Sequence, residues 1–401
     1  MAKSKIYVGL EIGTSKTCMV VGEVKSDHTV KILGVGETPT TGVRKGEITD
    51  MQNVRICVRE AHLKAEDVSN VSIDNILLAV TGKHIIGENF SGKLRLENEG
   101  RAVTYDDIDE VVERARDVAI PADHVCIMDI LRQFRIDEHD NLMTPLGLMA
   151  ETLEADYHIV HAIKTRIQNS IKCAREDNLN VEQVVFSPIA SALIALPMQA
   201  KEAGALVIDI GGGTTDYVLY QNGGVVASGC IPVGGDHVTN DIHILCEIPL
   251  SKAEKIKCLE GDASGDPAKS VGMATIPDEK GFQEIQISRD LLNSAIHARL
   301  HEVLKLVKAK LPADALQDVG HGVYLTGGTS LMKGFGELAN KVFDLEVYRL
   351  EEPQFSEIHE YYKDPRYSTA LGLIRYAQYR DAEQRDTRGF LRKLWGWVWG
   401  A

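Results

Sequence analysis

The chain has 401 residues, of which 25% are charged and 44% hydrophobic, and its formal net charge at pH 7 is −14. This length supports two or more domains with substantial cores. The acidity is ordinary for a soluble surface. It argues against nucleic-acid binding, which needs a basic face, so no nucleic-acid partner is expected.

Cysteine usage and hydropathy predict a cytoplasmic protein. The seven cysteines are scattered and form no CxxC pair, which indicates reduced thiols and argues against a zinc site. The N-terminal stretch MAKSKIYVGLEIG is broken by Glu11, so it predicts a strand and not a signal peptide. No apolar run reaches the roughly 18 residues that a membrane-spanning helix needs.

The first element pair is IYVGLEIGTSKTCMVVGEV, residues 6–24, a strand, a glycine turn and a second strand. Glycine permits positive φ and lets backbone N–H groups converge on an anion. The hydroxyl groups and the lysine of the turn add donors and positive charge. The turn therefore predicts phosphate binding by Gly13, Thr14, Ser15 and Lys16. Taken alone, it would equally fit a plain hairpin with a permissive turn.

Residues 84–159 predict a compact subdomain inserted between these strands and the helix TRIQNSIKCAREDNL. Its segment TYDDIDEVVERARDVA reads as an amphipathic helix, with acids on the side opposite to one apolar face. That face is formed by Ile108, Val111, Val112, Ala115 and Val118.

A second glycine unit, ALVIDIGGGTTDYVLYQNGGVV at 205–226, repeats the layout of the first. The predicted phosphate-binding residues here are Gly211, Gly212, Gly213, Thr214 and Thr215. A duplicated fold would place the two loops face to face across a cleft, gripping one nucleotide. Glu11 and Asp209 end the first strand of each unit, where they could hold Mg²⁺ through water.

The third glycine element is GVYLTGGTSLMKGFGELANKVF, residues 322–343. It predicts a strand, a paired-glycine turn and a helix that begins near Ser330, with nucleoside contact at Gly327, Gly328, Thr329 and Met332. A simple strand–helix junction would explain it equally well. Upstream lies a predicted amphipathic helix at 288–311, on which Arg289 and Arg299 are available to an acidic peptide, although a solvated basic face explains them as well.

These motifs together resemble the ATPase superfamily of actin, heat-shock chaperones and sugar kinases. LEIGTSKT and VIDIGGGTTDYV resemble its two phosphate loops, and YLTGGTSLMKGFGELA its adenosine motif. FSPIASALIAL (186–196) and YSTALGLIRYA (367–377) resemble its connecting helices. The resemblance implies an actin-like α/β fold, two similar mixed-sheet domains around a nucleotide cleft, with ATP and Mg²⁺ as cofactors. SKAEKIK resembles the segment over the adenosine, which adds Glu254 and Lys255 as nucleoside contacts. Glu11 departs from the usual aspartate.

The inserted subdomain, TGKHI (81–85) and KGEITDM (45–51) resemble the FtsA family of bacterial cell division. This resemblance implies a domain plan. The expected units are a first ATPase subdomain (1–83, 160–203 and 367–380), the insert (84–159), a second ATPase subdomain (204–235 and 306–366), a nucleotide-covering and partner-binding subdomain (236–305), a linker (381–387) and a terminal helix (388–401).

The C-terminal sequence FLRKLWGWVWGA holds all three tryptophans of the chain. As a helix it would place apolar and aromatic groups on one broad arc and basic groups on the other, the pattern of a helix that lies in a membrane interface. The predicted membrane-binding residues are Phe390, Leu391, Arg392, Lys393, Leu394, Trp395, Trp397, Val398 and Trp399. A terminal helix docked on its own protein is the alternative.

The expected function follows from the resemblance. The chain would polymerise with itself on the cytoplasmic face of the inner membrane at the division site, tether the C-terminal peptide of FtsZ and recruit later division proteins. The segment 186–196 contains no Gln, His, Glu or Asp, so the catalytic base is unknown and only slow ATP hydrolysis is expected. The alternatives are a sugar or acetate kinase, a heat-shock chaperone, or another actin-like scaffold of the pilus-assembly or cell-shape type.

Overall fold

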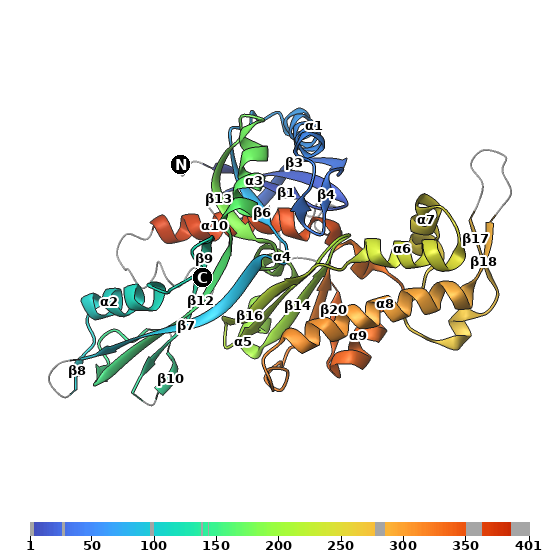
Figure 1. Ribbon diagram of the computed structural model, residues 1–401. Coiled ribbons are helices and arrows are strands. Elements are labelled where there is room, and N and C mark those ends of the chain that lie inside the picture. The colour runs from blue at the N-terminus through green and yellow to red at the C-terminus, as the bar shows by residue number, and fades with distance from the viewer. Residues whose placement is uncertain are drawn as a thin grey trace.

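A computed structural model describes residues 4–25, 29–96, 100–137, 139–142, 144–276, 285–349 and 363–385. Two five-stranded sheets form the centre, and a separate four-stranded sheet forms an inserted subdomain to one side (Figure 1). Both central sheets mix parallel and antiparallel strands. The predicted α/β class with two similar mixed sheets is therefore confirmed. Within the described ranges, no helix has the length and hydropathy to cross a bilayer.

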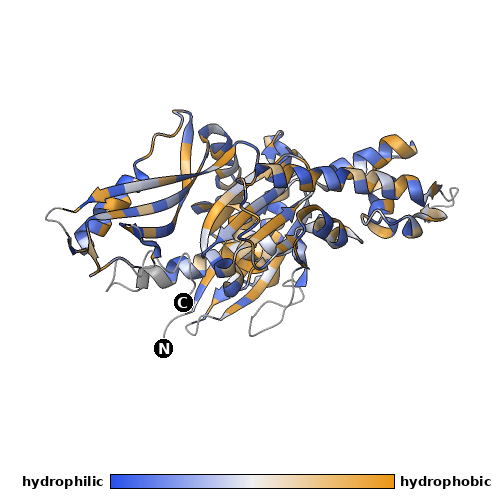
Figure 2. Ribbon diagram, turned by 90° about the horizontal axis from the view of Figure 1, so that it is seen from below, coloured by the Kyte–Doolittle hydropathy of each residue, from blue (hydrophilic) through white to orange (hydrophobic). Residues whose placement is uncertain are grey.

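The first sheet has the strand order β13-β6-β1-β2-β3. These strands are Asn180–Phe186, Asn75–Val80, Lys5–Ile12, Lys16–Val24 and Val30–Pro39. Helix α1 (Met51–Ser69) covers one face with α3 (Lys164–Arg175), and α10 (Ser368–Arg385) covers the other face with α4 (Ser187–Ala195) (Figure 1). Because both faces are covered, most side chains of β1, β2 and β6 are buried, and Figure 2 shows many orange, hydrophobic segments among the central strands.

The second sheet, β16-β15-β14-β19-β20, repeats the hairpin of the first. Its strands are Gly224–Ile231, Thr215–Gln221, Ala205–Ile210, Val323–Thr326 and Val347–Arg349. In each sheet an antiparallel hairpin (β1–β2 or β14–β15) lies beside a parallel strand (β6 or β19). Helices α5 (Met198–Ala203), α8 (Arg289–Lys310) and α9 (Phe335–Phe343) pack around it.

A helical subdomain extends from the second sheet (Figure 1). It contains α6 (Gly235–Cys246), α7 (Leu250–Glu260), the short helix η1 (Pro267–Ser270) and the hairpin β17–β18 (Met273–Ile276 and Ile285–Ser288). Helix α8 carries Leu292, Ile296 and Leu300 at four-residue spacing, and all three are buried in the core that this subdomain shares with the second sheet. The predicted amphipathic helix at 288–311 is thus present.

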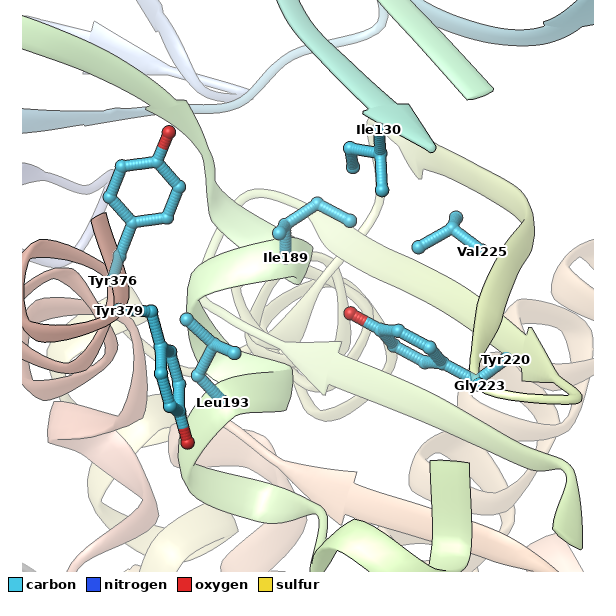
Figure 3. A pocket seen from close by; sticks show the side chains of 8 residues that line it. All are labelled: Ile130, Ile189, Leu193, Tyr220, Gly223, Val225, Tyr376 and Tyr379. Carbon is cyan, nitrogen blue, oxygen red and sulfur yellow. The ribbon is translucent and has the colours of Figure 1, made fainter. Parts of the chain in front are cut away.

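A small cavity lies where the domains meet (Figure 3). Its walls come from β9 (His124–Ile136) of the insert, from α4 and α10, and from β15, β16 and the turn between them. The aromatic wall residues are Tyr220, Tyr376 and Tyr379. Its volume of about 20 Å³ is room for one water molecule, so it is a packing gap and not a ligand site.

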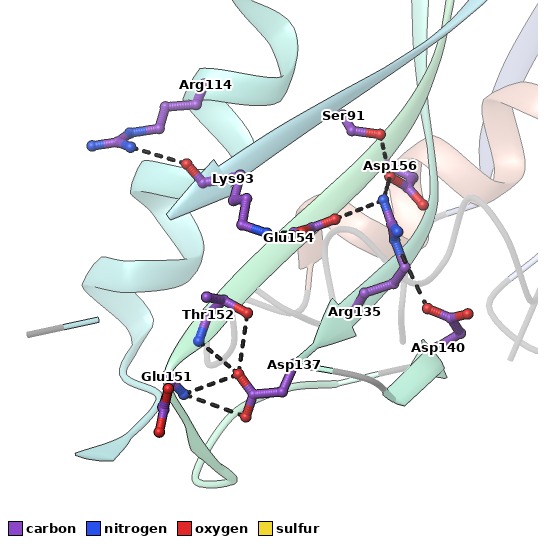
Figure 4. Close-up of polar contacts among 10 residues, drawn as sticks. All are labelled: Ser91, Lys93, Arg114, Arg135, Asp137, Asp140, Glu151, Thr152, Glu154 and Asp156. Carbon is purple, nitrogen blue, oxygen red and sulfur yellow. Dashed lines mark hydrogen bonds and ion pairs between the residues drawn. The ribbon is translucent and has the colours of Figure 1, made fainter. Parts of the chain in front are cut away.

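The insert is a sheet of order β10-β9-β12-β7, with one face on α2 (Tyr105–Arg116). The strands are His139–Leu142, His124–Ile136, Thr152–Ile163 and Ile85–Arg95, and a small β8–β11 pair (Arg101–Ala102 and Met149–Ala150) lies at its tip. Along β12, side chains alternate. Leu153 and Tyr157 are buried against α2, whereas Glu154 and Asp156 lie on the opposite face and pair with Arg135 at 2.7 and 3.0 Å (Figure 4).

Three predicted elements differ in extent. Helix α2 ends at Arg116, so Val118 of the predicted apolar face lies beyond the helix and is only half-buried. The helix expected near Ser330 is a short 3-10 turn, η2 (Gly328–Leu331), and α9 begins only at Phe335, because Gly334 with φ of 72° interrupts the chain. The linker expected from residue 381 is helical through Arg385 as the end of α10. Asp381 is buried and its Oδ2 pairs with Lys5 Nζ at 2.5 Å, which fixes this part of the helix.

Candidate functional site

The two glycine loops have the same internal geometry. In the first, the Gly13 amide donates to the Lys16 carbonyl at 3.0 Å, and in the second the Gly211 amide donates to the Thr214 carbonyl at 2.9 Å. Each loop follows the buried first strand of its sheet, so the duplicated topology brings the loops face to face. A Cβ added at Gly213 would lie 2.4 Å from Thr14 Oγ1. Only glycine permits this approach.

A cavity of about 500 Å³ opens beside the loops, in the size range of small-molecule sites. Most of the predicted site residues line it together. They are Glu11, Gly13, Thr14, Ser15, Lys16, Asp209, Gly211, Gly212, Gly213, Thr214, Glu254, Gly327, Gly328, Thr329 and Met332. The three glycine elements, which lie far apart in the sequence, therefore form one site.

Two predicted residues do not line the cavity. The Thr215 side chain is fully buried and its hydroxyl donates to the Val233 carbonyl at 2.8 Å, because neighbouring residues of a strand point to opposite faces. Lys255 lies outside the lining, and Lys257 takes its place. On helix α7 a spacing of three residues puts Lys257 on the same side as Glu254, whereas adjacent residues diverge.

The predicted metal-holding carboxylates face the same cavity. Thr369 Oγ1 donates to Asp209 Oδ2 at 3.1 Å. Burial and the nearby charge of Glu11 raise the pKa of Asp209 to about 6. Glu11 Oε2 lies 3.2 Å from Lys16 Nζ. Although burial disfavours the charge of Lys16, the carboxylate of Glu11 outweighs it and raises the pKa of Lys16 above its ordinary value.

These carboxylates fit a cation held mainly by water and phosphate. In the described part of the chain, no three His, Cys, Asp or Glu side chains are grouped so that they could hold a metal ion by themselves. Magnesium usually keeps several waters and takes one or two carboxylates together with substrate phosphates. Glu11 and Asp209 supply that pair.

Asp216 is a site residue that the sequence reasoning missed. It lines the cavity and accepts a hydrogen bond of 2.6 Å from Thr81 Oγ1. Burial raises the pKa of Asp216 to about 7, which the Thr81 hydroxyl opposes and the charge of Asp209 reinforces. A carboxyl group that titrates near neutral pH can take a proton from water. The hairpin register was the available signal, because Asp216 is the cross-strand partner of Asp209.

Further polar groups on the opposite side of the cavity were also missed. Lys257 Nζ donates to Thr239 Oγ1 at 2.8 Å and to Glu254 Oε2 at 2.6 Å, so it holds α7 against α6. Asp236 and Arg366 also line the cavity. Loop and helix packing across the site decided their positions, and no local sequence pattern indicated them.

Ser187, the first residue of α4, also lines the cavity. Its hydroxyl donates to the Val80 carbonyl at 3.0 Å, so its proton is already used. Gly327, with φ of 82°, approaches Asp209 so closely that an added Cβ would lie 2.3 Å from Asp209 Oδ1. Gly327 therefore lets the third glycine element pack directly against Asp209.

The two arginines predicted to meet a partner lie in different surroundings. Arg299 lines a surface groove of about 340 Å³ between α6 and α8, next to the exposed Ile244 and Leu245. Arg289 is paired with Glu260 and is not part of that groove. The predicted membrane-binding residues, 390–399, lie outside the described residues.

Comparison with known proteins gives family-level matches over nearly the whole chain. The family model "Cell division protein FtsA" matches residues 206–372, and the model "SHS2 domain inserted in FTSA" matches residues 82–161. Cell division protein FtsA of Neisseria meningitidis is 32% identical over 94% of this chain and 91% of its own length. The Escherichia coli K12 protein of the same name is 33% identical over 93% and 90%. The Bacillus subtilis one is 29% identical over 94% and 84%.

Solved structures confirm the actin-like fold. The PilM–PilN type IV pilus biogenesis complex matches with a TM-score of 0.65 at 17% identity, over 93% of this chain and 98% of that one. MreB5 of Spiroplasma citri bound to ADP matches with a TM-score of 0.57 at 15% identity, over 95% and 99%. At these identities the likeness concerns the fold alone, and that fold places a nucleotide in MreB5.

Proposed function

Because the chain belongs to the FtsA family of cell division proteins, we propose that it binds ATP and Mg²⁺ in its cleft and acts as a nucleotide-dependent scaffold. It polymerises on the cytoplasmic face of the inner membrane and tethers the FtsZ ring there, where later division proteins join it. The observation that carries the nucleotide part is the facing pair of glycine loops, with Thr14 against Gly213, beside a cavity walled by carboxylates.

The chemistry of the cavity suits a magnesium triphosphate. Backbone amides and the hydroxyls of Thr14, Ser15 and Thr214 supply donors, and Lys16 supplies a positive charge. Glu11 and Asp209 would hold Mg²⁺ through its waters, and the ion would neutralise phosphate charge. Titration of the purified chain with a fluorescent ATP analogue, with and without Mg²⁺, tests this assignment. Failure of the chain to bind ATP at millimolar concentration would refute the assignment of the cavity as a nucleotide site.

Hydrolysis is assigned to Asp216. Its carboxylate lies at the edge of the phosphate loops, is fixed by Thr81, and is basic enough to accept the proton of an attacking water. Because the pKa of Asp216 lies near 7, turnover should rise as the pH increases through about 7. Slow turnover is expected, because the segment 186–196 supplies no Gln, His, Glu or Asp that would help to orient the water. A fast turnover that is insensitive to Asp216→Asn would contradict the assignment.

The groove between α6 and α8 is the proposed dock for the C-terminal peptide of FtsZ. Ile244 is 61% exposed and Leu245 52% exposed at its edge, which offers apolar anchoring positions. Arg299 is paired with Asp241 at 2.6 Å and with Glu302 at 2.5 Å, so its charge is already balanced and it braces α8 against α6. The sequence-based expectation that Arg299 is available to an acidic peptide is therefore not met, and the apolar residues carry the proposed dock.

A fluorescence-anisotropy titration with a labelled FtsZ C-terminal peptide tests the dock. Ile244→Glu should weaken binding by about tenfold or more, as expected for loss of an apolar anchor. Leu259→Glu, on an exposed site of α7 outside the groove, is the matched control and should bind as the parent chain does. Equal loss in both variants would point to a general defect and refute the groove.

The membrane contact is assigned to residues 388–401 on their sequence. Seven apolar side chains at roughly 1–2 kcal/mol each would gain about 10 kcal/mol, and ordering the segment costs a comparable amount. Single chains should therefore bind weakly, whereas a polymer that presents many segments should bind tightly. Liposome co-sedimentation with and without ATP, using the full chain and a chain that ends at 387, tests this. Equal binding by monomers and polymers would contradict the coupling.

Imaging tests the cellular role. A fluorescent fusion should form a band at mid-cell, and depletion should give filamentous cells. Polar patches or helical tracks would instead favour a scaffold of the pilus-assembly or cell-shape type.

A further inference from the structure

A short hairpin, β4–β5 (Val43–Arg44 and Glu47–Ile48), with two residues in each strand, lies beside the phosphate loops. Its turn consists of Lys45 and Gly46 with φ of 53° and 76°, the pair of left-handed conformations that a tight two-residue hairpin requires. The amides of Thr49 and Asp50 close its base by donating to the Gly42 carbonyl at 2.7 and 3.0 Å. The hairpin is therefore a fixed element of the first domain.

The tip of the hairpin contacts both phosphate loops. The Gly46 amide donates to Thr14 Oγ1 at 3.2 Å. A hydroxyl that accepts a hydrogen bond from an amide keeps its own proton for another acceptor, and Thr14 lines the cavity. A Cβ added at Gly46 would lie 3.1 Å from the methyl groups of Thr214 and Thr81. The tip of the hairpin therefore leaves the Thr14 hydroxyl free to donate into the cavity, and it also contacts the second phosphate loop at Thr214.

The next residue, Glu47, faces both chain connections of the inserted subdomain. Its Oε2 lies 3.1 Å from Arg166 Nη1, on α3, three residues after the last strand of the insert. Its Oε1 lies 3.8 Å from Nδ1 of His84, the residue before the first strand of the insert. The His84 ring is buried, and neither of its nitrogens has a hydrogen-bond partner among the described residues. Glu47 is thus the charged group that both connections share.

We propose that the β4–β5 hairpin is a positioning element, in which Gly46 orients the Thr14 hydroxyl toward the bound phosphates and Glu47 couples occupancy of the cleft to the base of the inserted subdomain. This inference rests on the proposed binding of ATP. A phosphate that engages Thr14 shifts the hairpin tip, and Glu47 moves Arg166 and His84 with it. The orientation of the insert then depends on the nucleotide.

Hydrogen exchange on the full chain, with and without Mg²⁺ and ATP, tests the inference. In the parent chain ATP should slow exchange in both phosphate loops, in the hairpin, and at the connections 82–88 and 164–168. Glu47→Gln should keep the protection of the loops, lose it at the connections, and weaken ATP affinity by about three- to tenfold, as expected for one loosened hydrogen-bonded contact. Glu176→Gln removes a comparable pair, with Arg55 at 2.8 Å between α1 and the residue that follows α3, and should behave as the parent chain.

The outcomes separate the two proposals. No protection by ATP anywhere would refute the nucleotide site and the hairpin together. Protection confined to the phosphate loops of the parent chain would overturn the hairpin inference and leave the nucleotide site standing. Protection at the connections that persists in Glu47→Gln would also overturn it. Should Glu47→Gln fail to fold, Arg166→Gln removes the same contact from the other side and is measured in the same way.

Discussion

Replacing Asp216 by Asn keeps the shape of the side chain and removes its charge. The Thr81 hydroxyl, which donates to Asp216 Oδ1 at 2.6 Å, can donate equally to the amide oxygen of Asn. The substitution should therefore preserve the local packing. What changes is the free energy of holding a buried carboxylate beside Asp209.

The magnitude follows from the pKa. Burial, reinforced by Asp209, raises the pKa of Asp216 from 3.8 to about 7. At ~1.36 kcal/mol for each pH unit, this corresponds to about 4 kcal/mol. The folded state binds this proton more tightly than the unfolded state, so stability is lost as the pH rises from about 4 to about 7 and is constant above that. Without nucleotide, Asp216→Asn should be more stable than the parent chain by up to about 4 kcal/mol above pH 7.

Thermal unfolding of the nucleotide-free protein at pH 5, 6, 7 and 8 measures this difference. The melting temperature of Asp216→Asn should exceed that of the parent chain by a margin that grows from pH 5 to pH 7. Asp123→Asn, at an exposed position, is the control and should follow the parent profile. The same Asp216→Asn protein should bind ATP and lose hydrolysis. A margin that is constant across pH 5–8 would refute the raised pKa, and unchanged hydrolysis would refute the catalytic role.

Two further substitutions test the walls of the cavity. Gly213→Ala should weaken ATP binding by about tenfold or more, because its Cβ would lie 2.4 Å from Thr14 Oγ1. Gly336→Ala, on α9 and outside the cavity lining, is the control and should have little effect, because its Cβ would meet nothing nearer than 3.9 Å. Titration with a fluorescent ATP analogue compares the two variants, and equal losses would contradict the close approach of the loops. Lys257→Met should weaken ATP binding several-fold and raise the mobility of α7, because it removes the donor that ties α7 to Thr239 and Glu254. Calorimetric titration with ATP measures the affinity, and an affinity equal to that of the parent chain would disprove this role.

The sequence determined much of the fold because several of its signals are local. A strand, a glycine turn with hydroxyls and a second strand specify a hairpin through backbone conformation alone. Two such units predict two similar sheets, and both hairpins are present. The same local logic gave the buried face of α2, where Ile108, Val111 and Val112 recur at helical spacing.

Tertiary structure alone decided which side chains reach the cavity. Thr215 looked equivalent to Thr214, but strand alternation turns its hydroxyl away from the site. Lys257 and not Lys255 shares the wall with Glu254, because the orientation of α7 against α6 selects one helix face. Such choices depend on how elements distant in sequence pack, which no local pattern contains.

The site as a whole shows the same division. The glycines, hydroxyls and carboxylates of the site could be predicted from the sequence, because their chemistry belongs to each residue. Their pKa values and mutual distances could not be predicted in this way. The pKa of Asp216 near neutrality depends on burial and on Asp209 across the hairpin, and the reach of Glu47 to Arg166 and His84 depends on where the insert joins the first domain. Desolvation and distance are properties of the folded chain, so only the tertiary structure fixes them.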